Sequence, residues 1–240
     1  MRVVSWNIQH LEAYAEGCEP HVEFARAIAE LNPDVLLLQE VDLQQPRSGM
    51  ADQTALAAQY LGASHSLFRA TPQDAANYGI SVISKAPVIR WSTKSLRRSP
   101  IGMRLTFMMN GKPETFYCSD HERAVIAAQL DNGWLVANMH ASFVPGWSHL
   151  MVWQAVRWAR REARRAHCQL LLCGDFNLSS HTFLKLIGLR SLNAGSTFPA
   201  WEPSRQIDFV AVDRKSSVTA AAVKVKTFGI SDHCAVAVDF

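Results

Sequence analysis

The sequence has no long apolar segment. Among its 240 residues, no hydrophobic run approaches the roughly 18 residues that a membrane-spanning helix needs. The first residues, MRVVSWN, enter a strand-like pattern at once and leave no room for a signal peptide. We therefore expect a cytoplasmic protein that does not insert into a membrane.

Cysteine is scarce and irregularly spaced. The chain has five cysteines, and no two of them have the short spacing of a zinc knuckle. Cys118, Cys173 and Cys234 lie in apolar runs, where free cysteine behaves as a small hydrophobic residue. We expect a reduced protein without disulfides.

Repeats, low-complexity tracts and linker-like stretches are also absent. A chain of this length can bury a sizeable core, and the lack of a linker favours one domain over residues 1–240. The net charge of +3 is a mild basic bias, which would help an anionic substrate to bind without identifying it. No obligate protein partner is evident.

Strand-like segments outnumber helical ones. They come both as hairpin-like neighbours and in alternation with helices, which predicts an α/β (α+β) fold with two packed sheets and helices outside. The predicted strands are Arg2–Trp6, Val35–Gln39, Ile80–Ser84, Arg104–Met109, Val125–Leu130, Leu135–Met139, Leu170–Cys173, Ile207–Val212 and Ala235–Asp239. The predicted helices are His21–Leu31, Asp52–Leu61, Trp147–His167 and His181–Ile187.

Carboxylates, amides and imidazoles stand at the boundaries of these strands. Strand ends bring distant residues together on a rigid scaffold, so sites often form there. Taken singly, each residue could be an ordinary turn or strand-edge residue. Together they supply oxygen ligands for a hard cation and imidazoles for phosphate contact, as in metal-dependent phosphoester hydrolases. The set is Asn7, Glu40, His140, Asp175, Asn177, Asp208, Asp232 and His233.

The segment LLLCGDFNLSS, Leu170–Ser180, shows the choice most clearly, because a buried strand ends there on an acid. A charge at the rim of a core is costly without a partner or a role. Asp175 either begins a turn, with Ser179 or Ser180 capping the next helix, or faces an active-site cleft together with Asn177.

The ordered segments WNI, LLQE, YGISVISK, HERAV, NMH, GDFN, QIDFV and SDH resemble those of the endonuclease/exonuclease/phosphatase superfamily. That group comprises DNase I-like metal-dependent phosphoesterases, among them nucleases, sphingomyelinases and inositol polyphosphate phosphatases. The matches extend from Trp6 to His233. The resemblance implies a four-layer α/β/β/α sandwich with the site at one edge of its two sheets.

The resemblance also implies a metal site. Glu40 would be the principal ligand of Mg²⁺, for which Mn²⁺ can substitute, and Asn7 and Asp232 would lie near the ion. Magnesium prefers oxygen ligands and keeps several waters, so one firm carboxylate with lighter help suffices.

The same resemblance assigns the remaining residues to the reaction. Asp208 would hydrogen-bond His233 and hold its ring, and His140 would contact the scissile phosphate. Asp175 and Asn177 would position the attacking water and the non-bridging oxygens. Either Asp175 or the Asp208–His233 pair would be the base that activates this water.

The HERAV segment leaves three readings open. Glu122 could support His140, Arg123 could contact the phosphate, or both could belong to a solvated strand edge. Departures from relatives also matter, since Val41 stands where exonuclease III-type enzymes have threonine and Ile80 replaces a common asparagine. The first departure argues against a dedicated abasic-site endonuclease.

The substrate class is less certain than the chemistry. A nuclease acting on DNA or RNA competes with an enzyme for lipid head groups or small phosphoesters, and with a binding module that has lost activity. The full set of polar residues disfavours the last. The arginine-containing loop Leu96–Arg104, and the lack of a long hydrophobic hairpin for lipid, favour nucleic acid. The arginines of the helix from Trp147 are better explained as a solvated face.

Overall fold

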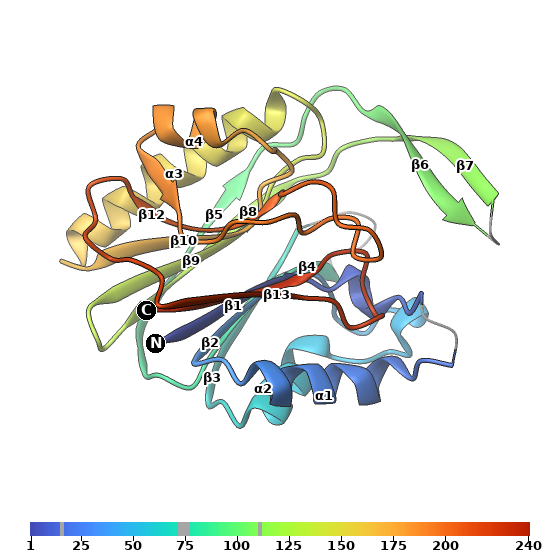
Figure 1. Ribbon diagram of the computed structural model, residues 1–240, viewed down its shortest axis with the longest axis horizontal. Helices are drawn as coiled ribbons and strands as arrows, with labels where there is room; N and C mark the ends of the chain where they lie inside the picture. Colours follow the sequence, from blue (N-terminus) through green and yellow to red (C-terminus); the bar gives the residue numbers. More distant parts are fainter. Residues whose placement is uncertain (15–16, 72–76, 110–111) are drawn as a thin grey trace.

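Two six-stranded sheets lie face to face in the computed structural model, which describes residues 1–14, 17–71, 77–109 and 112–240 (Figure 1). The first sheet contains β1 (Arg2–Asn7), β2 (Val35–Asp42), β3 (His65–Ala70), β4 (Tyr78–Ser84), β13 (Ala222–Lys226) and β14 (Ala235–Asp239), in the order β13-β14-β1-β2-β4-β3. The second contains β5 (Val88–Leu96), β8 (Arg123–Leu130), β9 (Trp134–His140), β10 (Gln169–Asp175), β11 (Leu189–Ser191) and β12 (Asp208–Asp213), in the order β11-β12-β10-β9-β8-β5.

Helices cover the two outer faces. The first sheet carries α1 (Pro20–Leu31) and α2 (Gln53–Leu61), and the second carries α3 (Trp147–Arg165) and α4 (His181–Leu186). Two short 3₁₀ turns, η1 (Gln9–Leu11) and η2 (Pro46–Ser48), complete the helical elements of the described chain. The four-layer α/β/β/α sandwich expected from the sequence is confirmed.

Local sequence signals set the helix boundaries. The carboxylate of Asp52 accepts a hydrogen bond from the backbone N–H of Ala55 (2.9 Å), which caps α2. The hydroxyl of Ser180 accepts one from the N–H of Phe183 (3.1 Å). Of the two candidate caps named from the sequence, Ser179 and Ser180, the residue that caps α4 is therefore Ser180.

Three apolar layers hold the sandwich together. One lies between the sheets, one beneath α1 and α2, and one beneath α3 and α4. Strands β1 and β10 are buried on both faces along nearly their whole length, which explains their continuous apolar sequences.

Parallel pairing at the centre of each sheet positions the site. Strand β1 runs parallel to β2, and β9 runs parallel to β10, with His140 opposite Asp175 in register. Because the carboxyl ends of parallel strands meet at one edge, the polar residues that end these strands gather there. Antiparallel β12 adds Asp208 directly opposite Asp175.

A buried amide pair joins the two sheets close to this edge. Gln39 of β2 donates from Nε2 to Oδ1 of Asn138 in β9 (2.7 Å). Asn138 in turn donates from Nδ2 to the carbonyls of Leu38 (2.8 Å) and Ser81 (2.9 Å). Both amide side chains are fully buried, so these hydrogen bonds favour a single relative placement of the sheets.

A two-stranded hairpin, β6 (Met103–Met109) with β7 (Lys112–Cys118), projects from the sandwich (Figure 1). The sequence pattern predicted β6 but missed β7, together with β3, β5, β11 and β13. Strands β5 and β13 lie at sheet edges and have many exposed residues, so they lack a clear apolar pattern.

Among the described residues, no helix combines the length and apolar character needed to cross a membrane. All five cysteines carry free thiols.

Candidate active site

The strand ends bring the predicted polar residues together at one edge of the sandwich. Hydrogen bonds or close charged contacts link each of them to another member of the set. The gathered residues are Asn7, Glu40, His140, Asp175, Asn177, Asp208, Asp232 and His233.

Glu40 lies on a β-bulge. The register between β2 and β4 shifts between Gln39 and Val41, and Glu40 has a positive φ of 55°. A bulge leaves its extra residue unpaired and re-aims the side chain. The carboxylate, 24% exposed, thereby turns into the site instead of following the alternation of the strand.

Asn7 bridges two of the carboxylates. Its Nδ2 donates to Oε1 of Glu40 (3.0 Å) and to Oδ2 of Asp175 (3.2 Å). Its Oδ1 accepts a hydrogen bond from the backbone N–H of Gln9 (3.1 Å). This orientation holds Glu40 and Asp175 together across the two sheets.

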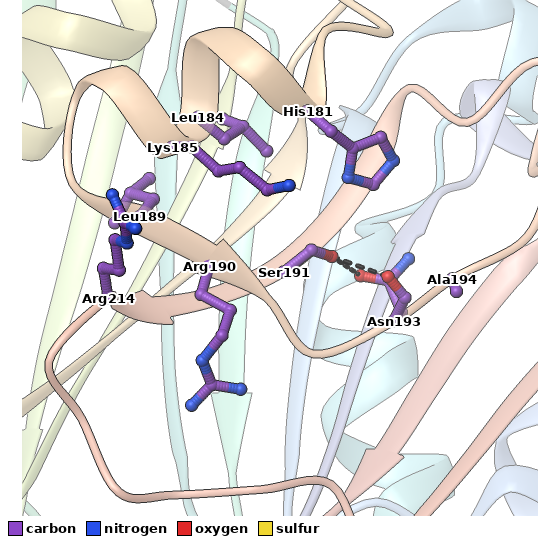
Figure 2. A pocket seen from close by; sticks show the side chains of 9 residues that line it. All are labelled: His181, Leu184, Lys185, Leu189, Arg190, Ser191, Asn193, Ala194 and Arg214. Atoms are coloured by element: carbon purple, nitrogen blue, oxygen red, sulfur yellow. Dashed lines mark hydrogen bonds between the residues drawn. The ribbon is translucent and has the colours of Figure 1, made fainter.

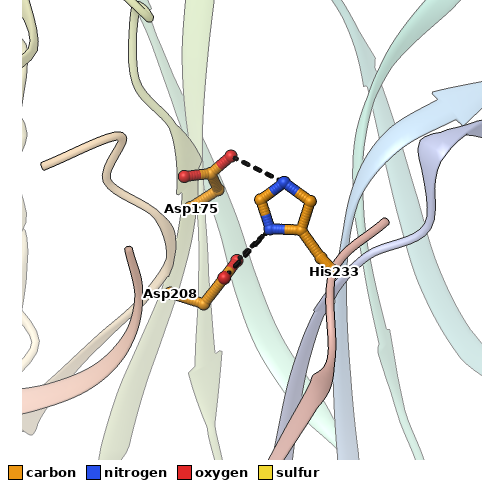
Figure 3. A group of neighbouring side chains, drawn as sticks. All are labelled: Asp175, Asp208 and His233. Carbon is orange, nitrogen blue, oxygen red and sulfur yellow. Dashed lines mark hydrogen bonds and ion pairs between the residues drawn. The ribbon is translucent and has the colours of Figure 1, made fainter. Parts of the chain in front are cut away.

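His233 lies between carboxylates, as Figure 3 shows. Its Nδ1 contacts Oδ2 of Asp208 (2.9 Å), and its Nε2 lies 3.9 Å from Oδ2 of Asp175. Burial alone would lower the pKa of this imidazole, but Asp208, with help from Asp175 and Asp232, raises the pKa to about 10. His233 is therefore an imidazolium at neutral pH. The hydroxyl of Thr197 donates to the same oxygen of Asp208, Oδ2 (2.6 Å), and helps to hold that carboxylate.

Two further carboxyl groups are difficult to ionise. Burial, reinforced by Asp208 and Glu40 and opposed by His233, raises the pKa of Asp175 to about 7. Burial, with Glu40 and Asp208 again adding to it and His233 opposing it, raises the pKa of Asp232 to about 6. The edge thus concentrates negative charge in a poorly solvated place.

His140 has the opposite character. Burial and then the nearby guanidinium of Arg123 hold the pKa of His140 well below its ordinary value, so the ring is neutral. Nη1 of Arg123 lies 3.2 Å from Nδ1 of the ring, and Nδ2 of Asn177 lies 3.3 Å from Nε2. Asn177 also donates from Nδ2 to the carbonyl of Ala141 (3.1 Å).

The neighbour of His140 in the HERAV segment is Arg123. This residue is 3% exposed, so it does not belong to a solvated strand edge. Asp120 lies 3.4 Å from its guanidinium, and among the described residues Glu122 makes no hydrogen bond or ion pair with His140. The pairing of Glu122 with His140, one of the three readings left open, is not the one that the described contacts form, since Arg123 is the neighbour of His140.

Several residues at this edge gave no signal in the sequence. Asp120 and Thr197 hold Arg123 and Asp208, but their importance depends on contacts between distant segments. Buried His121 packs its ring against Tyr78, with ring centroids 5.6 Å apart, and has no hydrogen-bond partner among the described residues. Only its place in the HERAV segment, two residues before Arg123, could have pointed to it.

The donor set fits a hard divalent cation near Glu40. Burial, with smaller contributions from neighbouring carboxylates, raises the pKa values of Asp175 and Asp232, and a cation bound here would favour their ionised forms. Ligand atoms of Asp175, Asp208 and His233 also lie within 4.8 Å of one another. However, a protonated imidazole cannot bind a metal ion, so the carboxylate side around Glu40 is the better place.

A separate cavity of about 360 Å³ lies away from this cluster (Figure 2). It is bounded by α4, β11 and neighbouring loops, and Lys185, Arg190 and Arg214 are among its lining residues. None of the gathered residues lines it.

Gly174 precedes Asp175 for a steric reason, which leads to a prediction. Its φ is +135°, and a Cβ atom would lie 1.8 Å from the carbonyl oxygen of Met139 in the neighbouring strand. We expect Gly174→Ala to cost more than about 3 kcal/mol of unfolding free energy, measured by chemical denaturation. The control is Gly133→Ala, since Gly133 also has a positive φ but open space around it. Equal losses in both variants would show that backbone strain, not this collision, sets the cost.

The fold agrees with solved phosphoesterase structures of low sequence identity. An endonuclease/exonuclease/phosphatase from Beutenbergia cavernae is 23% identical with a TM-score of 0.67, covering 99% of this chain and 70% of that one. A 3′-5′ exonuclease from Neisseria meningitidis is 20% identical with a TM-score of 0.64, covering 100% and 99%. A mannosyl-6-phosphatase from Bacteroides thetaiotaomicron is 14% identical with a TM-score of 0.65, covering 100% and 98%.

No curated protein matches the chain in sequence. The family model of the endonuclease/exonuclease/phosphatase family, in contrast, matches residues 4–233, nearly the whole chain. This match includes every residue gathered at the polar edge of the sandwich, from Asn7 to His233. The chain therefore belongs to the endonuclease/exonuclease/phosphatase family and is a phosphoester hydrolase.

Proposed function

We propose that the protein is a Mg²⁺-dependent phosphodiesterase that cleaves nucleic-acid phosphodiesters by attack of water, with residues 1–240 forming one catalytic domain. The observation that supports this best is the crowding of Glu40, Asp175 and Asp232 beside the imidazolium of His233. An anionic phosphodiester repels a nucleophile, so a site for it must combine positive charge with a proton acceptor.

Asp175 is the better candidate for the base. His233 already carries a proton at neutral pH because its pKa is raised to about 10, so it cannot accept another. Asp175 has a pKa raised to about 7 and lies at a strand end beside Asn7 and Asn177. A base whose pKa lies near the working pH combines availability with proton affinity.

The histidines then bind the phosphate. The Nε2–H of His233 can donate to a non-bridging oxygen, while Asp208 holds the ring by its Nδ1. Neutral His140, with Arg123 and Asn177 beside it, offers a second group of donors at the end of β9 in the second sheet. Positive charge from His233 and Arg123 would stabilise the negative charge that develops in the transition state.

The metal would be held by Glu40 and Asp232. The amide nitrogen of Asn7 faces the Glu40 carboxylate, so we propose that Asn7 orients this ligand and that any direct bond to the ion uses Oδ1. A bound Mg²⁺ would neutralise a phosphate oxygen and stabilise the leaving alkoxide. Mn²⁺, with similar preferences for oxygen ligands, would substitute.

Asp208 and His233 are expected to act as one unit. Asp208→Ala, His233→Ala and the double variant should lose similar activity, because residues that share one role are not additive. Turnover of the three variants, each checked for folding by circular dichroism, measures this. Losses that multiply in the double variant would mean that the two residues act separately.

A substrate panel tests the proposal as a whole. Purified protein with Mg²⁺ or Mn²⁺ would be assayed on plasmid DNA, RNA, sphingomyelin, inositol phosphates and bis-p-nitrophenyl phosphate, with a chelator as control. We expect cleavage of nucleic acid and of the small diester, lost in chelator. Activity that persists in chelator would contradict the metal requirement.

A phosphatase acting on a small phosphoester or a lipid head group is the second candidate. The fold also resembles that of the Bacteroides mannosyl-6-phosphatase, so the architecture alone does not separate the two. A Neisseria 3′ phosphatase with a similar fold was solved with a product DNA hairpin, so phosphatase activity and binding of DNA occur together in that protein. Release of inorganic phosphate from monoesters, without cleavage of polynucleotide chains, would favour this second function.

A further inference from the structure

We propose that the base of the β6–β7 hairpin binds single-stranded nucleic acid that leads into the active site. The hairpin base is defined here as the loop Arg97–Gly102 together with Arg104 and Tyr117. The inference rests on the proposed nuclease function and deepens it, because it selects a single strand over a duplex.

The hairpin base presents cations and an aromatic face to solvent. Arg97, Arg98 and Arg104 are all exposed, and no carboxylate pairs with them among the described residues. Tyr117 is 64% exposed and stands directly opposite Arg104 in the β6–β7 register. Residues opposite each other in an antiparallel pair share one face, so this arginine and this aromatic ring are neighbours.

Hydrogen bonds hold these groups in place. The backbone N–H of Gly102 donates to the hydroxyl of Tyr117 (2.9 Å), which fixes the ring against the loop. The indole N–H of Trp147 donates to the carbonyl of Arg97 (2.9 Å) and ties the start of the loop to α3. The surface is therefore built before any ligand arrives.

A short chain of contacts connects the hairpin base to the catalytic edge. The N–H of Ser99 donates to Oδ2 of Asp120 (2.6 Å), whose Oδ1 lies 3.4 Å from Nη2 of Arg123. Nη1 of Arg123 lies 3.2 Å from Nδ1 of His140. A strand bound at the hairpin base would consequently have a fixed position relative to the histidine proposed to contact the phosphate.

The chemistry of the surface matches a single strand. Unpaired arginines contact backbone phosphates, and an exposed aromatic ring stacks on an unpaired base. A duplex would offer its phosphates but keep its base faces covered. The combination therefore favours a single-stranded segment or a frayed end.

The test measures binding of fluorescein-labelled single-stranded DNA of about 12 nucleotides, by anisotropy in chelator so that no cleavage occurs. We expect Arg97→Ala/Arg98→Ala to raise the Kd about tenfold and to reduce the slope of log Kd against log salt by roughly 1.4. Tyr117→Ala should raise the Kd about tenfold, whereas Tyr117→Phe, which keeps the ring and loses only the hydrogen bond from Gly102, should bind clearly more tightly than Tyr117→Ala. A duplex of equal length should bind more weakly and should respond little to Tyr117→Ala.

The matched control is Arg161→Ala/Arg164→Ala, which removes the same charge from the exposed face of α3. Equal effects of the two double variants would reduce the result to net charge and overturn the inference. If the wild type cleaves nucleic acid and the hairpin variants have the same KM, the inference is overturned but the proposed function stands.

A protein that binds no oligonucleotide and hydrolyses only small monoesters would overturn both the inference and the proposed function. Binding to phosphatidylglycerol vesicles that needs Tyr117, with unchanged oligonucleotide affinity, would assign the hairpin to lipid instead.

Discussion

Replacing Glu40 by alanine is expected to lower turnover by at least about 10³-fold, the equivalent of about 4 kcal/mol of transition-state stabilisation. Glu40 is the carboxylate that the β-bulge turns into the site, and Asn7 holds it there. Without it, the ion would lose its firmest ligand. Glu40→Gln keeps the size of the side chain but removes the charge, and it should lose nearly as much activity.

A second measurement separates metal binding from catalysis. The thermal midpoint of the wild type should rise when Mg²⁺ is added, because a ligand that binds the folded state stabilises it. The Glu40 variants should show little rise. Glu19→Ala, which removes an exposed acid at the start of α1, is the control. A Glu40→Ala protein with wild-type turnover and a full response to Mg²⁺ would refute the assignment.

Asp175→Asn is expected to lower turnover on the order of 10²–10⁴-fold, the usual contribution of a positioned proton acceptor. The substitution is nearly isosteric and keeps an oxygen for the backbone N–H of Asn177. If Asp175 merely began a turn, asparagine would serve equally well and activity would survive.

Stability should respond to Asp175→Asn in a direction set by pH. The pKa of Asp175 is raised from 3.8 to about 7, so its ionised form destabilises the folded state. This destabilisation is complete above about pH 7 and absent below about pH 4, and asparagine removes it. The gain is partly offset because Nδ2 of the new amide replaces the oxygen that accepts from Asn7.

The measurement is the thermal midpoint without metal at pH 5 and pH 8, beside turnover with Mg²⁺. The variant should melt level with the wild type or slightly higher, and its advantage should be larger at pH 8. Asp131→Asn, in the exposed turn between β8 and β9, is the control. A variant that stays active but melts early would show that Asp175 serves the fold.

The sequence predicted that these polar residues lie together, because most of them stand at the ends of buried strands. Such strands have continuous apolar sequences, and a polar residue that ends one, such as Asp175 after LLLCG, stands out. The order of these segments along the chain then predicted the sandwich. The bulge at Glu40 could not be predicted, because it depends on how β4 pairs with β2.

The contact between Arg123 and His140 was also hard to predict, because it too depends on how a strand is placed in its sheet. Strand β8 begins at Arg123, and adjacent residues of a strand point to opposite faces, so a shift of one residue exchanges Glu122 for Arg123 at the site. The partners Asp120 and Thr197 come from loops whose approach depends on the folded chain. Strand β7 escaped prediction because its sequence, KPETFYC, begins with Lys112, Pro113 and Glu114 and so lacks an apolar alternation in its first half.

The amide pair Gln39–Asn138 has a consequence for how activity is lost. Glu40 belongs to one sheet and His140 to the other, each one or two residues beyond this pair. The proposed site would therefore form only while the two sheets stay docked, because it takes residues from both. Loss of the Gln39–Asn138 hydrogen bond would therefore weaken the placement of Glu40 relative to His140 even if neither of these two side chains were changed.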